Sequence, residues 1–385
     1  MKTSEYKTKS GMTDCQMPAS EKAWPIGLDI GYSAVKGLCP NRSFIFPAYA
    51  RKLPEGRVTL KEEAPSDLRY RDVKTGEIWT VGSLAYDEVD ADDVMDSEAE
   101  LFGRHRYFSP MFQVIARTGM ALGLETNEYG GPDGLPVYLE TGLPPKYLSD
   151  ASVLKEALGG HHDFELKIGS GAWKRFTFDL PQENIHVMPQ PLGALISASV
   201  GMDGRQLPIA QTYFSSNLVI FDPGFGTLDD YTVRKGSVVG YETFPELGMR
   251  EVFARTCRDI QRMHGVEISV PELQNRLADG TIRSMDRREM KAVRHPFDDL
   301  LEKNSRRVCE EAVEKLKSIH NFFADVDYII AAGGTYDAWA ADFNRVFKDM
   351  EGLEIIPGNV NDPRLSNEYS NVRGYYFYLL NRLNR

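Results

Sequence analysis

Short apolar runs alternate along this chain with longer segments in which apolar residues recur at helical spacing. The runs are rich in β-branched residues and predict strands in Ile26–Lys36, in Leu218–Val233 and at the start of Tyr328–Trp339. Helical spacing predicts helices at Ser109–Leu122, Leu247–Met263, Asp298–Phe323 and Tyr369–Leu383. Because sets of strands are separated by helices, the pattern favours α/β domains over an all-α or all-β chain.

Two of these segments predict hairpins with the same polar and small residues at the turn. In the later hairpin the first strand ends at Asp222, and Gly224 and Gly226 form the turn; in the earlier one the strand ends at Asp29, followed by Gly31. Glycine lets such a turn bring backbone N–H groups close to an anion, and carboxylates beside it suit phosphate bound with magnesium. A single hairpin of this kind is equally well explained as an ordinary structural turn. The pair suggests a duplicated architecture that grips one polyphosphate from two sides.

A third turn lies in Tyr328–Trp339, where Gly333 and Gly334 separate a strand from a helical pattern. Glycines at a strand-to-helix turn let a nucleotide approach the backbone at the N-terminus of the helix. The three turns therefore predict a nucleotide site.

Composition narrows the classes of function. With 45 basic and 56 acidic residues the formal net charge is −11, which argues against a broad DNA-wrapping surface. No apolar run approaches the roughly 18 residues of a membrane span. The cysteines are scattered without metal-ligand or CxxC spacing, which favours a reducing cytoplasm. The polar N-terminal residues lack the apolar core of a secretion signal and predict a flexible tail, with a contact arm as the alternative.

In their order along the chain, the three turns resemble the phosphate-1, phosphate-2 and adenosine motifs of the actin and heat-shock chaperone ATPase superfamily. Three shorter segments are similar to the ParM-type branch, the bacterial plasmid-segregation actins: WTVGSLA at Trp79–Ala85, TGLP at Thr141–Pro144 and NVRG at Asn371–Gly374. These landmarks cover nearly the whole chain.

The resemblance implies an actin-like fold, with two related α/β domains and a nucleotide cleft between them. With the tail predicted from composition at residues 1–24, it places the first domain at residues 25–200, completed by a terminal helix within residues 361–385. The second domain occupies residues 201–360 and carries a helical insertion at about residues 265–300.

The resemblance also implies roles for individual residues. Asp29 and Asp222 match the aspartates that position Mg²⁺, largely through its waters, and Lys36 matches the lysine that reaches the phosphates. Gln190 lies where actin has the glutamine that orients the attacking water, whereas an amide satisfying the loop between two prolines is its structural alternative. Asp229 falls where actin has a water-orienting histidine, so its role is open. The remaining cofactor-binding residues match the turns themselves: Gly31, Tyr32, Ser33, Gly224, Phe225, Gly226, Thr227, Gly333, Gly334 and Thr335. Tyr32 departs from the serine that is frequent there, which leaves a hydroxyl contact to the γ-phosphate in doubt.

The function implied by the resemblance is a filament-forming ATPase in the cytoplasm that uses ATP or GTP with Mg²⁺. Its partners would be further copies of the chain and an adaptor protein that binds a plasmid centromere, with no direct nucleic-acid or membrane contact. Val270–Lys291 and Lys52–Tyr70 are expected contact regions, with solvent-exposed elaborations as the alternative. A chaperone-like ATPase and a small-molecule kinase of the same superfamily are the competing functions. The kinase would need a catalytic aspartate in a pocket for a hydroxyl acceptor, and no motif for one is evident.

Overall fold

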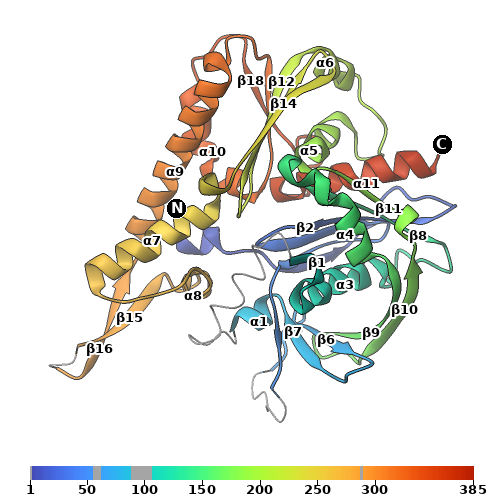
Figure 1. Ribbon diagram of the computed structural model, residues 1–385, viewed down its shortest axis with the longest axis horizontal. Coiled ribbons are helices and arrows are strands. Elements are labelled where there is room, and N and C mark those ends of the chain that lie inside the picture. Colours follow the sequence, from blue (N-terminus) through green and yellow to red (C-terminus); the bar gives the residue numbers. More distant parts are fainter. Residues whose placement is uncertain (1, 55–61, 88–105, 287–288) are drawn as a thin grey trace.

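The computed structural model describes residues 2–54, 62–87, 106–286 and 289–385. Within these ranges the strands form three larger sheets and a two-stranded ribbon (Figure 1). Sheet 1 has the order β1 (Gly11–Asp14), β4 (Arg42–Pro47), β3 (Ala34–Cys39), β2 (Trp24–Ile30), β8 (Val137–Leu143) and β11 (Ile185–Pro189).

Sheet 2 lies beside sheet 1 in the N-terminal half, and sheet 3 belongs to the C-terminal half. Sheet 2 has the order β10 (Lys174–Leu180), β9 (Gly160–Ile168), β6 (Leu68–Asp72), β7 (Ile78–Val81) and β5 (Ala50–Lys52). Sheet 3 has the order β14 (Ser237–Phe244), β13 (Leu228–Arg234), β12 (Asn217–Pro223), β17 (Tyr328–Ala331) and β18 (Glu354–Pro357). The ribbon pairs β15 (Thr281–Asp286) with β16 (Lys291–Pro296).

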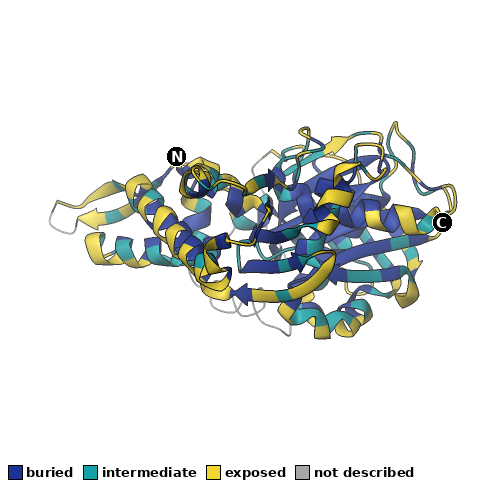
Figure 2. Cartoon of the chain, turned by 90° about the horizontal axis from the view of Figure 1, so that it is seen from above, coloured by how far each residue is buried: buried dark blue, intermediate teal, exposed yellow. Residues whose placement is uncertain are grey.

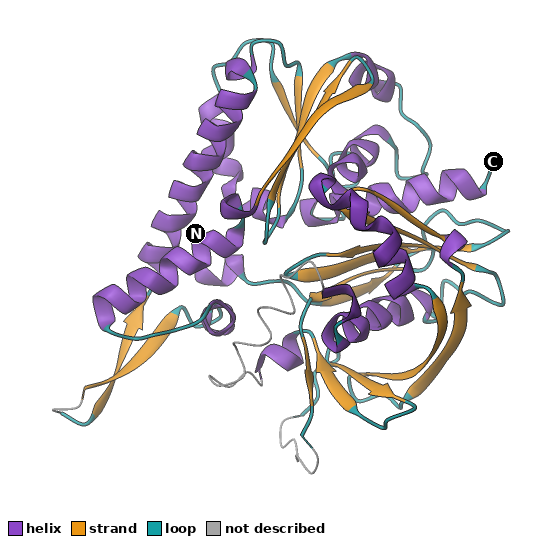
Figure 3. Cartoon of the chain, in the orientation of Figure 1, coloured by secondary structure: helices purple, strands orange, loops and turns teal. Residues whose placement is uncertain are grey.

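Helices separate and cover the sheets (Figure 3). In the N-terminal half they are α1 (Ser83–Asp87), α3 (Pro110–Leu124), α4 (Ala151–Leu158) and α5 (Gln190–Ser199). In the C-terminal half they are α6 (Ile209–Ser215), α7 (Met249–His264), α8 (Val270–Arg276), α9 (Asp298–Ile319), α10 (Gly334–Phe347) and α11 (Ser370–Leu383). The four helices predicted from spacing are thus confirmed as α3, α7, α9 and α11, with ends shifted by a few residues.

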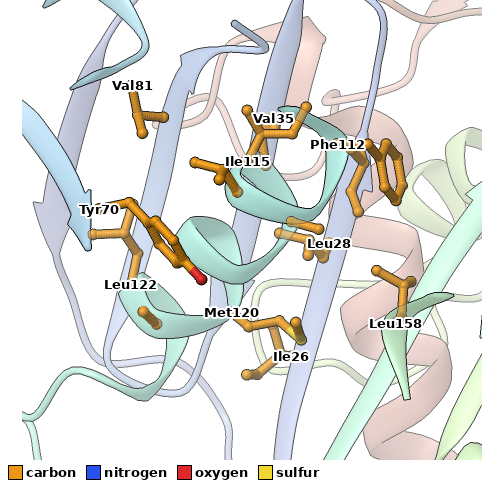
Figure 4. Close-up of a cluster of buried hydrophobic side chains, with 14 of the residues drawn as sticks. Ile26, Leu28, Val35, Tyr70, Val81, Phe112, Ile115, Met120, Leu122 and Leu158 are labelled. Atoms are coloured by element: carbon orange, nitrogen blue, oxygen red, sulfur yellow. The ribbon is translucent and has the colours of Figure 1, made fainter. Parts of the chain in front are cut away.

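The N-terminal half has its core between sheet 1 and sheet 2, where α3 lies. Figure 4 shows apolar side chains of β2 and β3 meeting those of α3, with Tyr70 and Val81 of sheet 2 on the other side. The opposite face of sheet 1 is covered by α11. Because both faces of β2 are covered, all of its residues are buried, which explains its nearly continuous apolar run. In Figure 2 buried residues gather in the sheets, and exposed residues mark the projecting ribbon.

Sheets 1 and 3 repeat one topology, so the predicted α/β class and duplicated architecture are confirmed. In each, an antiparallel hairpin (β2–β3 or β12–β13) is extended by another antiparallel strand on one side. On the other side the first strand of the hairpin pairs in parallel with a later strand, which is β8 in sheet 1 and β17 in sheet 3. Each of these strands follows a long helix, α3 or α9. A further parallel strand, β11 or β18, completes each sheet. The two hairpin turns are therefore equivalent points of the repeat.

Helices α5 and α11 cross between the two repeats. The apolar side chains Ala194, Leu195 and Ala198 of α5 are buried with strands of sheet 3, while α11 packs on sheet 1. At the crossing a methyl group on Gly374 would overlap the carbonyl group of Gly193, so the two backbones are in direct contact. A larger residue at this point would force the helices apart.

The N-terminal segment differs from the predicted flexible tail. Residues 11–14 form β1, which pairs antiparallel with β4 at the edge of sheet 1, and Thr3 and Met17 are buried. Backbone hydrogen bonds to the sheet edge can hold such a mostly polar segment, and Met12 and Met17 add apolar contacts with the core. Because the segment is mostly polar, hydropathy did not reveal the strand.

The predicted helical insertion is only partly helical. Helix α8 takes up its first part, and the ribbon β15–β16 takes up most of the rest. Arginine, glutamate, methionine, lysine and alanine dominate the ribbon sequence, and all of them have high helix propensity. Pairing of the two strands overrides that local preference.

The other boundaries stay predictions. The proposed limit at residue 200 coincides with the end of α5, although α5 packs on strands of sheet 3 as well as of sheet 1. Of the expected contact loop Lys52–Tyr70, residues 55–61 lie outside the described residues.

Candidate functional site

A cavity of about 470 Å³ lies between the turns of the two equivalent hairpins. Every residue predicted to take part in catalysis or cofactor binding lines this cavity: Asp29, Gly31, Tyr32, Ser33, Lys36, Gln190, Asp222, Gly224, Phe225, Gly226, Thr227, Asp229, Gly333, Gly334 and Thr335. The fold thus brings together residues from both halves and from three separate turns, while their individual roles stay predictions. The cavity volume is within the usual range of small-molecule sites.

The turn after β2 presents a partly buried ion pair to the cavity. Asp29 and Lys36 face each other across the β2–β3 pair, and Lys36 Nζ donates to Asp29 Oδ2 at 3.0 Å. Burial acts to lower the pKa of Lys36, but Asp29, Glu368 and Asp222 hold that pKa above its usual value. Lys36 therefore carries a positive charge in the cavity, as a residue that meets phosphate must.

The turn after β12 brings two further carboxyl groups into the cavity. Asp222 and Asp229 face each other across β12 and β13. Burial, reinforced by Asp29, raises the pKa of Asp222 to about 6, and burial with Asp222 raises that of Asp229 to about 8. Thr243 Oγ1 donates to Asp229 Oδ1 at 2.6 Å. Buried carboxyl groups with raised pKa values are stabilised in their ionised form by a nearby cation.

The turn after β17 packs directly on the β12 turn. Gly333 has a positive φ of 82°, and a Cβ there would lie 2.6 Å from the Pro223 carbonyl oxygen and 2.7 Å from Asp222 Oδ1. Thr335 Oγ1 donates to the Gly224 carbonyl oxygen at 2.9 Å, which ties the two turns together. Only glycine at position 333 permits this approach, and it leaves the N-terminus of α10 facing the cavity.

Gln190 is the first residue of α5 and connects that helix to the turn after β2. Its Nε2 donates to Asp29 Oδ1 at 3.3 Å. The side chain is therefore in the cavity, and it hydrogen-bonds a carboxylate rather than the loop backbone. This position is compatible with orienting a water molecule.

Sequence reasoning missed several residues of the cavity wall. Asn371 Nδ2 donates to Asp222 Oδ2 at 2.7 Å, and its Oδ1 is buried with no hydrogen-bond partner in the described ranges. The NVRG segment was used only for its similarity to the ParM-type branch. Nothing in its sequence indicates that Asn371 contacts Asp222. Further wall residues are Ala34, Met249, Asp337, Ala338, Glu368 and Glu5–Lys9.

The donor set fits a magnesium nucleotide complex whose ion is held largely through water. Among the described residues no group of three or more histidine, cysteine, aspartate or glutamate side chains is placed to hold a metal ion directly. Two carboxylates, a partly buried lysine and three glycine-containing turns suit such a complex. The unpartnered Oδ1 of Asn371 adds one hydrogen-bond acceptor beside Asp222. None of the helices in the described parts of the chain combines the length and apolar character needed to cross a membrane.

Comparison with known proteins agrees with the fold. Residues 27–193 match the family described as the N-terminal domain of actin-like proteins. A ParM from Clostridium botulinum, solved as a 15-stranded filament, shares 17% identity, with 93% of this chain and 99% of that chain covered and a TM-score of 0.68. The archaeal actin homolog Ta0583 shares 16%, with 92% and 98% covered and a TM-score of 0.60. A ParM from Bacillus thuringiensis, solved with AMPPNP, shares 15%, with 94% and 99% covered and a TM-score of 0.58. A search of curated proteins finds no match.

Proposed function

We propose that this chain, an actin-like protein by its N-terminal family match and by its ParM-like fold, is a nucleotide-dependent filament-forming ATPase. The observation that carries the proposal is the placement of Asp29 and Asp222 at equivalent hairpin turns lining one cavity. ATP or GTP would bind there with Mg²⁺, and the turn at Gly333 and Gly334 would receive the nucleoside. The ParM of B. thuringiensis, which has the same fold, was solved with a nucleotide analogue.

Hydrolysis of a phosphoanhydride depends mainly on positioning and on neutralising charge. Mg²⁺, when bound, neutralises phosphate charge, and Asp29 and Asp222 would hold it largely through water. Lys36 would contact the phosphates with its ammonium group, which Asp29 orients. Gln190, fixed at the start of α5, would orient the attacking water, and Asp229 is the second candidate for that role. No side chain has to act as nucleophile.

Filament formation would follow from the way in which the two repeats share one ligand. A nucleotide gripped from both sides fixes the angle between the repeats, and that angle determines which surfaces a neighbouring copy meets. A head-to-tail contact between unlike surfaces does not close on itself and produces a filament. The C. botulinum protein of the same fold was solved as a filament.

The cellular role that best fits is plasmid segregation in the cytoplasm through an adaptor protein that binds the plasmid centromere. The formal net charge of −11 supports an indirect attachment, because direct binding to DNA depends on lysine and arginine meeting phosphates.

Assembly is tested by sedimentation and light scattering across protein concentration, with ATP, with a non-hydrolysable analogue and without nucleotide. ATP and the analogue should each give sedimentable polymer above a critical concentration, and only the ATP polymer should decay as product accumulates. Asp222→Ala is the matched control, since it should lose both nucleotide binding and assembly. A chain that hydrolyses ATP but stays monomeric at every concentration would contradict the filament proposal and favour the chaperone-like or kinase function.

A further inference from the structure

The N-terminal segment runs along the wall of the cavity and is fixed at both ends. Thr3 is buried, and its Oγ1 donates to the Leu277 carbonyl oxygen, just beyond α8, at 2.9 Å. At the other end, β1 pairs with β4 of sheet 1. Figure 1 shows the N-terminus beside α7 and α9, with the chain running from there to β1. The segment therefore connects the C-terminal half to the N-terminal half along the cavity wall.

Between these anchors, Glu5–Lys9 forms part of the cavity wall. Tyr6 packs against the apolar core of the C-terminal half. Lys7 and Thr8 also line a small recess with Ser83 and Tyr86 on one side and Gln274 and Asn275 on the other, so the segment passes between α1 and α8. These contacts involve both halves of the molecule.

Lys9 has a specific partner in this wall. Its Nζ lies 2.7 Å from Glu368 Oε1, and the Glu368 side chain is only 10% exposed. Asp337 of α10 lines the same part of the cavity, close to the turn at Gly334. Without Lys9, the carboxylates of Glu368 and Asp337 would lose a neighbouring positive charge. They would then repel an anionic ligand more strongly and weaken its binding.

We propose that Thr3–Lys9 is a strap that forms the outer wall of the nucleotide site, and that Lys9 is a nucleotide-retaining residue within it. The strap rests on the proposed function, since its ligand is the same nucleotide. Because the strap lines the cavity and is tied to both halves, we expect the nucleotide to leave only when the strap detaches from Leu277, at the end of α8, or from Glu368. The strap is thus expected to set the rate of nucleotide release.

The test measures how fast a fluorescent ATP analogue with Mg²⁺ leaves the full-length protein when excess ATP is added. Lys9→Met should raise the dissociation rate about two- to fivefold, the range for loss of one ion pair with an exposed partner. Lys9→Arg should retain the wild-type rate. Deletion of residues 2–9 should raise the rate on the order of tenfold or more, because the whole wall is lost.

Lys22→Met is the matched control, because Lys22 is an exposed lysine of the same N-terminal region outside the cavity. It should release the analogue at the wild-type rate. Thermal unfolding without nucleotide should be nearly the same for Lys9→Met and wild type, which separates a role in retention from a role in folding.

The outcomes distinguish the strap from the proposed function. Wild-type protein that does not bind the analogue would contradict the nucleotide-dependent function and the strap with it. If wild-type protein binds the analogue, and the Lys9→Met and deletion variants release it at the same rate as wild type, the strap proposal is wrong and the proposed function stands. Faster release in both variants, with Lys9→Arg and Lys22→Met unchanged, is the result that supports it.

Discussion

Gln190 illustrates how one side chain can serve hydrolysis without serving binding. It lines the cavity at the start of α5 and hydrogen-bonds Asp29, but it carries no charge that would attract phosphate. If it orients the attacking water, its contribution arises in the transition state rather than in the ground state.

Gln190→Ala should therefore bind nucleotide almost as tightly as wild type and hydrolyse it on the order of a hundredfold more slowly. Phosphate release and nucleotide affinity are measured side by side, and Gln190→Glu tests whether a carboxylate at this position retains activity. Loss of affinity without a specific loss of turnover would make Gln190 a structural residue.

Glu140 is a buried carboxyl group of β8 whose protonation should affect folding. It is 1% exposed, and its Oε2 has no hydrogen-bond partner among the described residues. Burial raises its pKa from 4.5 to about 8, against the weaker opposing effect of Arg382 and Lys155. Between these two values the folded protein holds a proton that the unfolded chain has released.

The free energy of unfolding is therefore not reduced by Glu140 below pH 4.5, where both states hold the proton. It falls as the pH rises from 4.5 to about 8, because only the unfolded chain releases the proton in that range. The expected loss is up to about 1.4 kcal/mol per pH unit in that window. Glu140→Gln cannot release a proton, so its stability relative to wild type should rise between pH 5.5 and pH 8. Denaturant unfolding at both pH values checks this, and equal pH dependence in the two proteins would show that Glu140 does not titrate there.

Among the secondary-structure elements, α5 and α11 cross between the two repeats, and their close approach depends on Gly193 and Gly374. Gly374→Ala should destabilise the fold by roughly 1–3 kcal/mol or more, because the methyl group meets backbone that cannot rotate away. Gly240→Ala in β14 is the control, since a methyl group there would meet nothing closer than 3.8 Å. Thermal unfolding compares the two variants, and equal stability would mean that the helices can separate without cost.

Elements with a strong local pattern could be predicted from the sequence, and those without one could not. The two hairpins in which glycine follows an aspartate by two positions, and the turn at Gly333, located the cavity, because glycine marks turns with positive φ or close backbone approach. The strand β1 was missed because it is only four residues long and Met12 is its one large apolar side chain, so it shows no alternating pattern. Asn371 was missed because its contact with Asp222 joins residues far apart in the sequence.

At the scale of the whole molecule, the duplicated topology explains why sequence reasoning succeeded with the site and failed with its surroundings. The two repeats supply equivalent turns that each carry a readable signature. Within the part of the chain that the structure describes, the ribbon β15–β16 and the N-terminal strap have no counterpart in the other repeat. Their positions depend on pairing and on long-range contacts such as Thr3 with Leu277, which no local pattern encodes.

The direct backbone contact between Gly193 and Gly374 has a mechanical consequence. If the two repeats move relative to each other, we expect them to rotate about this contact, because the backbones of α5 and α11 have no side chains between them that could rearrange. Helix α9 extends over 22 residues in the C-terminal half, a length of about 33 Å. A rotation of about 10° about an axis perpendicular to α9 would give its two ends displacements that differ by about 6 Å. A small rotation between the repeats would therefore move residues far from the cavity by a distance comparable to the length of a side chain.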